Sequence, residues 1–168
     1  EHVPAGHFGV LGGPVVFVGV NPANEKRFIV QSIEGGGWGG RPGEDGASAT
    51  VSVCQGDVRN ATIEGIELKC PVMIESRTLR TDSGGPGEHR GGFGMETKMR
   101  NFVEGKWICE PPKRGDNCPA WGLWDGNSGH VGEYQMRKPG EDEYRLVETA
   151  RNNVQPETEV LVRTGGGG

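Results

Sequence analysis

Short apolar runs separated by turn residues make up most of this chain. The run Val15 to Val18 follows Pro14 and predicts a buried strand, and Arg27 to Ile33 predicts a second one. Between them lies the turn sequence Asn21-Pro22-Ala23-Asn24. These segments therefore predict a hairpin that leads the chain into a glycine-rich loop.

One short helix is predicted in the middle of the chain. Asn60 is a favoured N-cap residue, and Ile63, Ile66 and Leu68 follow at helical spacing until Pro71 stops the pattern. The segment 47–53 is small and β-branched, and its pattern fits a strand or a helix equally well.

The remaining apolar patterns predict extended segments, separated by turn sequences such as Lys138-Pro139-Gly140. The predicted strands are Pro71 to Thr81, Gly94 to Val103, Gly132 to Arg137, Glu143 to Glu148 and Glu159 to Arg163. The fold class is therefore mainly β (α+β), with many short antiparallel strands, long glycine-rich loops and one or two short helices.

Composition changes this picture in one respect. The 168 residues fit a single domain, 1–168, but only 33% are hydrophobic and 31 are glycine. We expect such a chain to complete its core against partner chains. The last four residues, 165–168, are all glycine, and we expect ordered structure to end there.

Charge and hydropathy exclude some classes of partner. The net charge is −5, and Lys and Arg are scattered among Asp and Glu, which argues against a nucleic-acid surface. No apolar run approaches the ~18 residues of a membrane span, so we expect no membrane contact and a cytoplasmic location. The cysteines, at positions 54, 70, 109 and 118, lack zinc-ligand spacing. Free buried thiols are favoured over a Cys109–Cys118 disulfide.

Two glycine-rich loops carry the candidate chemistry. In the first, from Gly35 to Gly46, glycines surround Arg41 and Asp45; in the second, six glycines between Asp82 and Gly94 accompany Glu88, His89 and Arg90. So many glycines indicate positive φ angles or close approach by another backbone or a ligand.

The candidate site residues are the charged and histidine side chains of these loops: Arg41, Asp45, Asp82, Arg90 and His89. The arginines can hold a carboxylate or orient a polar substrate through two parallel hydrogen bonds. Alternatively, Arg41–Asp45 and Arg90–Asp82 are internal pairs that fix each loop. No phosphate-binding motif and no metal-ligand spacing is present, so no catalytic residue and no metal ligand is assigned.

Four ordered blocks carry a family resemblance. They are the sequence from Gly35 to Gly46, Gly56-Asp57-Val58-Arg59-Asn60-Ala61-Thr62, Leu79 to Gly94, and Trp121-Gly122-Leu123 with Gly126. Together they resemble the C-terminal part of the hydantoinase B/oxoprolinase family, over nearly the whole chain. That family includes the B-type subunits of N-methylhydantoinases, 5-oxoprolinases, a caprolactam-opening enzyme, and acetone and acetophenone carboxylases.

The resemblance implies a subunit or fragment of an ATP-dependent hetero-oligomeric enzyme. Its expected partners are a hydantoinase-A-like subunit that binds ATP and Mg²⁺, the remaining B-type polypeptide and a small-molecule substrate. Any divalent metal is expected in a partner or in the N-terminal part of the B-type polypeptide, and this chain alone binds none and is inactive. The activity implied is cyclic amide hydrolysis, with ketone carboxylation or a purely structural subunit as alternatives.

Overall fold

The protein is described from a computed structural model, which covers residues 3–7, 15–51, 59–109 and 118–168. Nine strands and one short helix lie in these ranges, and they confirm the prediction of a mainly β fold. They are β1 (Val15–Val20), β2 (Arg27–Ser32), α1 (Ile63–Glu67), β3 (Val72–Leu79), β4 (Met95–Asn101), β5 (Gly105–Ile108), β6 (Glu133–Arg137), β7 (Arg145–Leu146), β8 (Arg151–Val154) and β9 (Glu159–Arg163).

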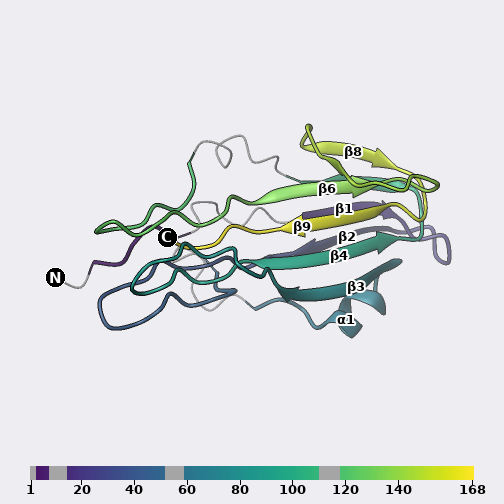
Figure 1. Ribbon diagram of the computed structural model, residues 1–168. Helices are drawn as coiled ribbons and strands as arrows, with labels where there is room; N and C mark the ends of the chain where they lie inside the picture. Colours follow the sequence, from purple (N-terminus) through teal and green to yellow (C-terminus); the bar gives the residue numbers. More distant parts are fainter. Residues whose placement is uncertain (1–2, 8–14, 52–58, 110–117) are drawn as a thin grey trace.

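The strands form two antiparallel sheets, with the orders β2-β1-β5-β8 and β3-β4-β9-β6-β7. Figure 1 shows the strands gathered in one half of the molecule, whereas the long loops and the C-terminus lie in the other half. The sheets therefore act as a scaffold that holds the loop half of the chain.

The core lies between the two sheets because each contributes alternating apolar side chains. Phe17 and Trp107 of the first sheet are fully buried, with ring centroids 4.7 Å apart. Met99 and Val160 of the second sheet belong to the same buried cluster. The buried indole of Trp107 donates from Nε1 to Asn101 Oδ1 at 2.9 Å, so its polar atom is paired inside the core.

The predicted hairpin is confirmed, with Val18 opposite Ile29 in the β1–β2 ladder. The predicted helix is present, but Asn60 as its N-cap is wrong. Thr62 caps the helix by accepting a hydrogen bond from the Gly65 N–H. The Asn60 side chain instead bonds both backbone groups of Ile33, which ties the helix entry to the end of β2.

The observed strand boundaries differ from the predicted ones where the alternation of apolar and polar side chains is weak. The prediction Glu143 to Glu148 shrinks to the two residues of β7, and β5 and β8 were not predicted at all. Residues 47–51 form neither strand nor helix, apart from a single bridge between Thr50 and Gly36, while 52–53 lie outside the described residues. The backbone of this segment is held by the glycine loops, not by a sheet.

The described cysteines, Cys70, Cys109 and Cys118, are free, so the disulfide alternative is wrong. Cys70 and Cys109 are buried, as expected, but Cys118 is exposed, and Cys54 lies outside the described residues. Burial raises the pKa of the Cys109 thiol to about 12, which keeps it protonated and unreactive. No described helix is long and apolar enough to cross a membrane.

Candidate functional site

The glycine-rich loops interlock around the C-terminal residues 165–168. We call this assembly the glycine bundle, comprising segments 5–6, 35–50, 83–94, 120–130 and 165–168. Gly37 and Gly40 donate backbone hydrogen bonds to the carbonyls of Gly165 and Gly168, at 3.0 and 2.8 Å, and Gly85 donates to Gly167 at 2.8 Å. Residues 165–168 are therefore ordered and form the centre of the bundle.

The bundle needs glycine because its backbones lie in direct contact. A Cβ added at Gly167 would lie 2.0 Å from the Trp38 carbonyl oxygen, and one at Gly92 would lie 2.0 Å from that of Ala47. Among the described glycines, positive φ angles occur only at Gly43 and Gly140. Close approach by another backbone thus explains glycine at most of these positions.

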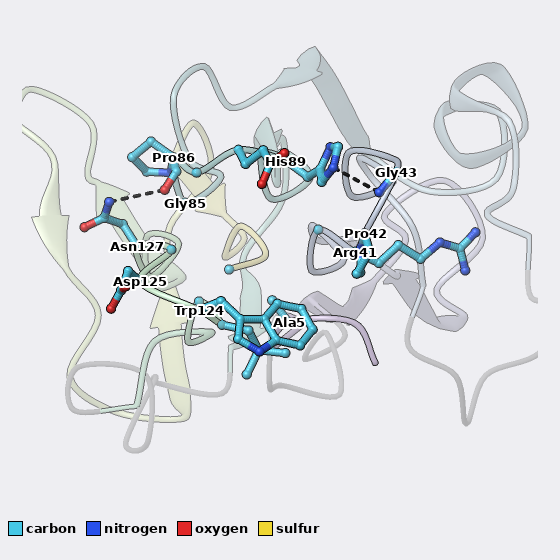
Figure 2. Close-up of a pocket in the computed structure, with 17 residues that line it drawn as sticks. Ala5, Arg41, Pro42, Gly43, Gly85, Pro86, His89, Trp124, Asp125 and Asn127 are labelled. Carbon is cyan, nitrogen blue, oxygen red and sulfur yellow. Dashed lines mark hydrogen bonds between the residues drawn. The ribbon is translucent and has the colours of Figure 1, made fainter. Parts of the chain in front are cut away.

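A pocket of about 360 Å³ opens on the surface of the glycine bundle (Figure 2). Its walls are mostly main chain, since seven of the lining residues are glycines. The lining comprises Ala5, Gly40, Arg41, Pro42, Gly43, Gly85, Pro86, Gly87, Glu88, His89, Gly122, Leu123, Trp124, Asp125, Gly126, Asn127 and Gly168. A pocket of this size accommodates a small organic molecule.

His89 closes one side of the pocket and joins the two predicted loops. Its Nε2 accepts a hydrogen bond of 2.9 Å from the Gly43 N–H, where Gly43 has a φ of 93°. This bond requires an unprotonated Nε2 and therefore leaves Nδ1–H as the donor of the neutral ring. His89 thus lies at the pocket and also fixes the first loop against the second.

Trp124 lies on the opposite side of the pocket from His89, as Figure 2 shows. It occupies a turn in which Gly126 N–H donates to Leu123 O at 2.9 Å, and both central residues have positive φ, 47° at Trp124 and 67° at Asp125. This geometry is that of a type I′ turn, which normally selects Asn or Gly. The indole of Trp124 is 68% exposed despite its size.

The structure separates the five predicted site residues. Arg41 lines the pocket, but its guanidinium bonds Glu44 and its side chain extends away from the cavity (Figure 2). Asp45 bonds the second loop, accepting from the Arg90 N–H at 2.8 Å and lying 3.7 Å from the Arg90 guanidinium. The alternative of internal pairs Arg41–Asp45 and Arg90–Asp82 is therefore wrong in its partners, although Asp45–Arg90 does fix the loops.

Asp82 is exposed, has a φ of 55° and does not line the pocket. Arg90 stacks its guanidinium on the Phe93 ring at 3.9 Å from the centroid and does not line the pocket. Of the five residues, only Arg41 and His89 line the pocket, and the Arg41 side chain points away from it.

Sequence reasoning missed the wall formed by Trp124, Asp125 and Asn127. The available signal was Asp125-Gly126 after an aromatic residue, which is typical of a tight turn. Asn127 Nδ2 donates to Pro86 O at 3.2 Å and so joins this wall to the second glycine loop. Among the described residues no group of His, Cys, Asp and Glu side chains could hold a metal ion.

The chain belongs to the hydantoinase B/oxoprolinase family, whose family model matches residues 1–168. One relative is a protein of Pseudomonas sp. (strain NS671) assigned as the B-type polypeptide of a D-/L-hydantoinase. It is 33% identical over 115 residues, which are 68% of this chain and 19% of that protein.

Two solved structures share the fold. The ATP-dependent caprolactamase of Pseudomonas jessenii superimposes with a TM-score of 0.81 at 25% identity, covering 99% of this chain and 30% of that one. Nucleotide-free acetone carboxylase superimposes with a TM-score of 0.79 at 19% identity, covering 98% of this chain and 26% of that one. The chain thus spans less than a third of the length of these relatives.

Proposed function

We propose that this chain is part of a B-type subunit in an ATP-dependent multi-subunit enzyme that hydrolyses a cyclic amide. The observation that carries the proposal is the family match over residues 1–168. The similarity to a protein assigned to a hydantoinase and to a caprolactamase favours cyclic amides as substrates.

The proposed division of labour assigns nucleotide chemistry to a partner. A hydantoinase-A-like partner holds ATP with Mg²⁺, and phosphorylation of the amide carbonyl oxygen makes that oxygen a good leaving group. Water then adds to the activated carbon, the ring nitrogen departs as the amine and leaves an acyl phosphate, and a second water hydrolyses that acyl phosphate to the carboxylate and phosphate. The pocket of the glycine bundle is proposed to hold the ring, since its glycine walls admit a ligand close to the main chain.

Within this proposal, the loop charges have unequal roles. His89 forms a wall of the substrate pocket, whereas Asp45 and Arg90 hold the two glycine loops in register. A subunit with a purely structural role is disfavoured because the interlocked loops leave an open, lined cavity on their surface.

The test is reconstitution of the complex from this chain, the remaining B-type polypeptide and the A-type partner, with each component also assayed alone. We expect ATP-dependent ring opening of hydantoin or caprolactam by the complex, followed as ADP release together with ring-opened product. We expect no turnover by this chain alone. Turnover of ATP with acetone and bicarbonate, but with none of the cyclic amides, would instead support the second candidate, a ketone carboxylase with the same fold.

A further inference from the structure

The turn that carries Trp124 is strained without a packing reason. A tryptophan in the left-handed region is unfavourable, and here a second left-handed residue, Asp125, follows it. The indole is 68% exposed and lines the pocket, so burial within this chain does not offset the strain. Strained residues of this kind gather at ligand sites, where the surrounding structure holds them in place.

The facing wall contains a glycine, Gly87, that is packed less tightly than most other glycines of the bundle. Gly87 has no positive φ, and a Cβ added there would meet its nearest atom, the His89 carbonyl oxygen, at 3.3 Å. Other bundle glycines would meet backbone atoms at distances such as 2.0 Å for Gly91. A side chain at Gly87 would press on the His89 carbonyl and would also occupy open space at the pocket.

The charges around the pocket do not suit an anion. Among the described residues of its lining, Arg41 is the only lysine or arginine, and that guanidinium bonds Glu44. Glu88 and Asp125 also line the pocket, and neither carboxylate has a partner among the described residues. A ligand carboxylate would thus lose water without gaining a cation and would lie near two negative charges.

We infer that the pocket binds an uncharged cyclic amide, with its ring against the Trp124 indole, and rejects amides that carry a carboxylate. This inference rests on the proposed function and adds the substrate class that this site selects. A flat indole face contributes dispersion and stacking to a ring without requiring a charge on it. The main-chain walls then accommodate the ring edge in a space that a side chain at Gly87 would fill.

Two probes that differ only by a carboxylate test the charge preference. They are 2-pyrrolidinone and 5-oxoproline, each titrated calorimetrically into the assembled complex without ATP. We expect 2-pyrrolidinone to bind at least roughly tenfold more tightly. In the Glu88→Lys variant, which places a cation at the pocket, we expect this ratio to fall roughly tenfold. The matched control Glu104→Lys has the same change of net charge at an exposed position outside the lining and should keep the wild-type ratio.

A tryptophan pair tests the indole. Trp121 is 64% exposed and Trp124 is 68% exposed, but only Trp124 lines the pocket. Trp124→Asn removes the ring but places a residue that tolerates positive φ, so we expect the turn to be retained. We expect 2-pyrrolidinone binding to this variant to weaken roughly tenfold. Trp121→Asn should change binding less than twofold. Thermal melting of both complexes checks folding, and Trp124→Asn should not melt below Trp121→Asn.

The outcomes separate the two proposals. Equal or tighter binding of 5-oxoproline, no binding of either probe, or equal effects of the two Trp variants would overturn the inference, even if the complex opens a cyclic amide with ATP. Conversely, the expected binding pattern in a complex that opens no cyclic amide would sustain the inference about the pocket and defeat the proposed hydrolase function.

Discussion

Glu34 is the buried charge at which the strands meet the glycine bundle. It lies two residues after the end of β2, precedes Gly35 and is 1% exposed. Its carboxylate accepts hydrogen bonds from Ser32 Oγ and Thr97 Oγ1, both at 2.6 Å, and lies 3.2 Å from the Arg77 guanidinium. Because these partners come from both sheets, one side chain fixes how the sheets deliver the first glycine loop.

Replacing Glu34 should destabilise the protein more than the small change in side-chain size suggests. We expect Glu34→Leu to lower the free energy of unfolding by ~3–5 kcal/mol, since Arg77 would stay partly buried without its partner. The double variant Glu34→Leu/Arg77→Leu should recover part of that loss. Chemical denaturation of the wild type, both single variants and the double variant measures the coupling. Strict additivity of the two single losses would contradict this account.

At the scale of elements, β9 organises the larger sheet because it lies between β4 and β6. Its first residue, Glu159, is opposite Arg100 on one side and Arg137 on the other, and it is 4% exposed. Tyr144 donates a hydrogen bond to the same carboxylate. Opposite charges in register on neighbouring strands stabilise the pairing and specify it.

This cross-strand cluster predicts a loss of stability in acid. Burial raises the pKa of Glu159, but hydrogen bonds from Arg137, Tyr144 and Lys98 outweigh it and lower the pKa from 4.5 to about 2. Because the pKa of Glu159 is lower in the folded state, this carboxylate stabilises the fold at pH values above its unfolded-state pKa. That stabilisation is lost as pH falls from about 4.5 to about 2. We expect this loss to reach about 3 kcal/mol in pH-dependent unfolding.

Glu159→Gln should remove most of that pH dependence and lower stability at neutral pH. Glu148→Gln, at an exposed residue outside the cluster, should keep the wild-type profile. A profile of Glu159→Gln that matches the wild type would show that other carboxylates cause the acid sensitivity.

The strands and the helix also show which elements could be predicted from the sequence and which could not. The β1–β2 hairpin was predictable because Val15 and Phe17 alternate inward and a turn sequence follows. Strand β8 was not, because Arg151-Asn152-Asn153-Val154 has one apolar residue and belongs to an edge strand held by its backbone pairing to β5. The cap prediction failed because Asn60 has a distant partner, Ile33, that sequence proximity does not indicate.

At the scale of the whole molecule, the candidate site depends on contacts between distant loops. Thr164 Oγ1 donates to Gly35 O at 2.5 Å across 129 residues of sequence, and the terminal glycines join the four other segments of the bundle. The sequence indicated that the loops mattered, and it placed His89 at the centre of one of them. It could not indicate the pairing, because glycine-to-glycine contacts have no side-chain pattern and the Trp124 wall comes from a third segment.

The glycine bundle should therefore behave as one unit that folds and forms the pocket together. At Gly167 an added methyl group would overlap the Trp38 carbonyl oxygen at 2.0 Å, and backbone on several sides prevents relaxation. We expect Gly167→Ala to cost ~4 kcal/mol or more, and to abolish lactam binding as the loops separate.

Gly132→Ala is the matched control for this change. Its nearest atom would lie 3.2 Å from the new methyl group, its φ is not positive, and it is outside the pocket lining. We expect a change within about 1 kcal/mol, because the lower entropy of the unfolded chain offsets the closer contact. Thermal melting and 2-pyrrolidinone titration on both complexes measure the difference. Equal melting temperatures would mean that the bundle backbones can separate at little cost, and the pocket would then not depend on their close packing.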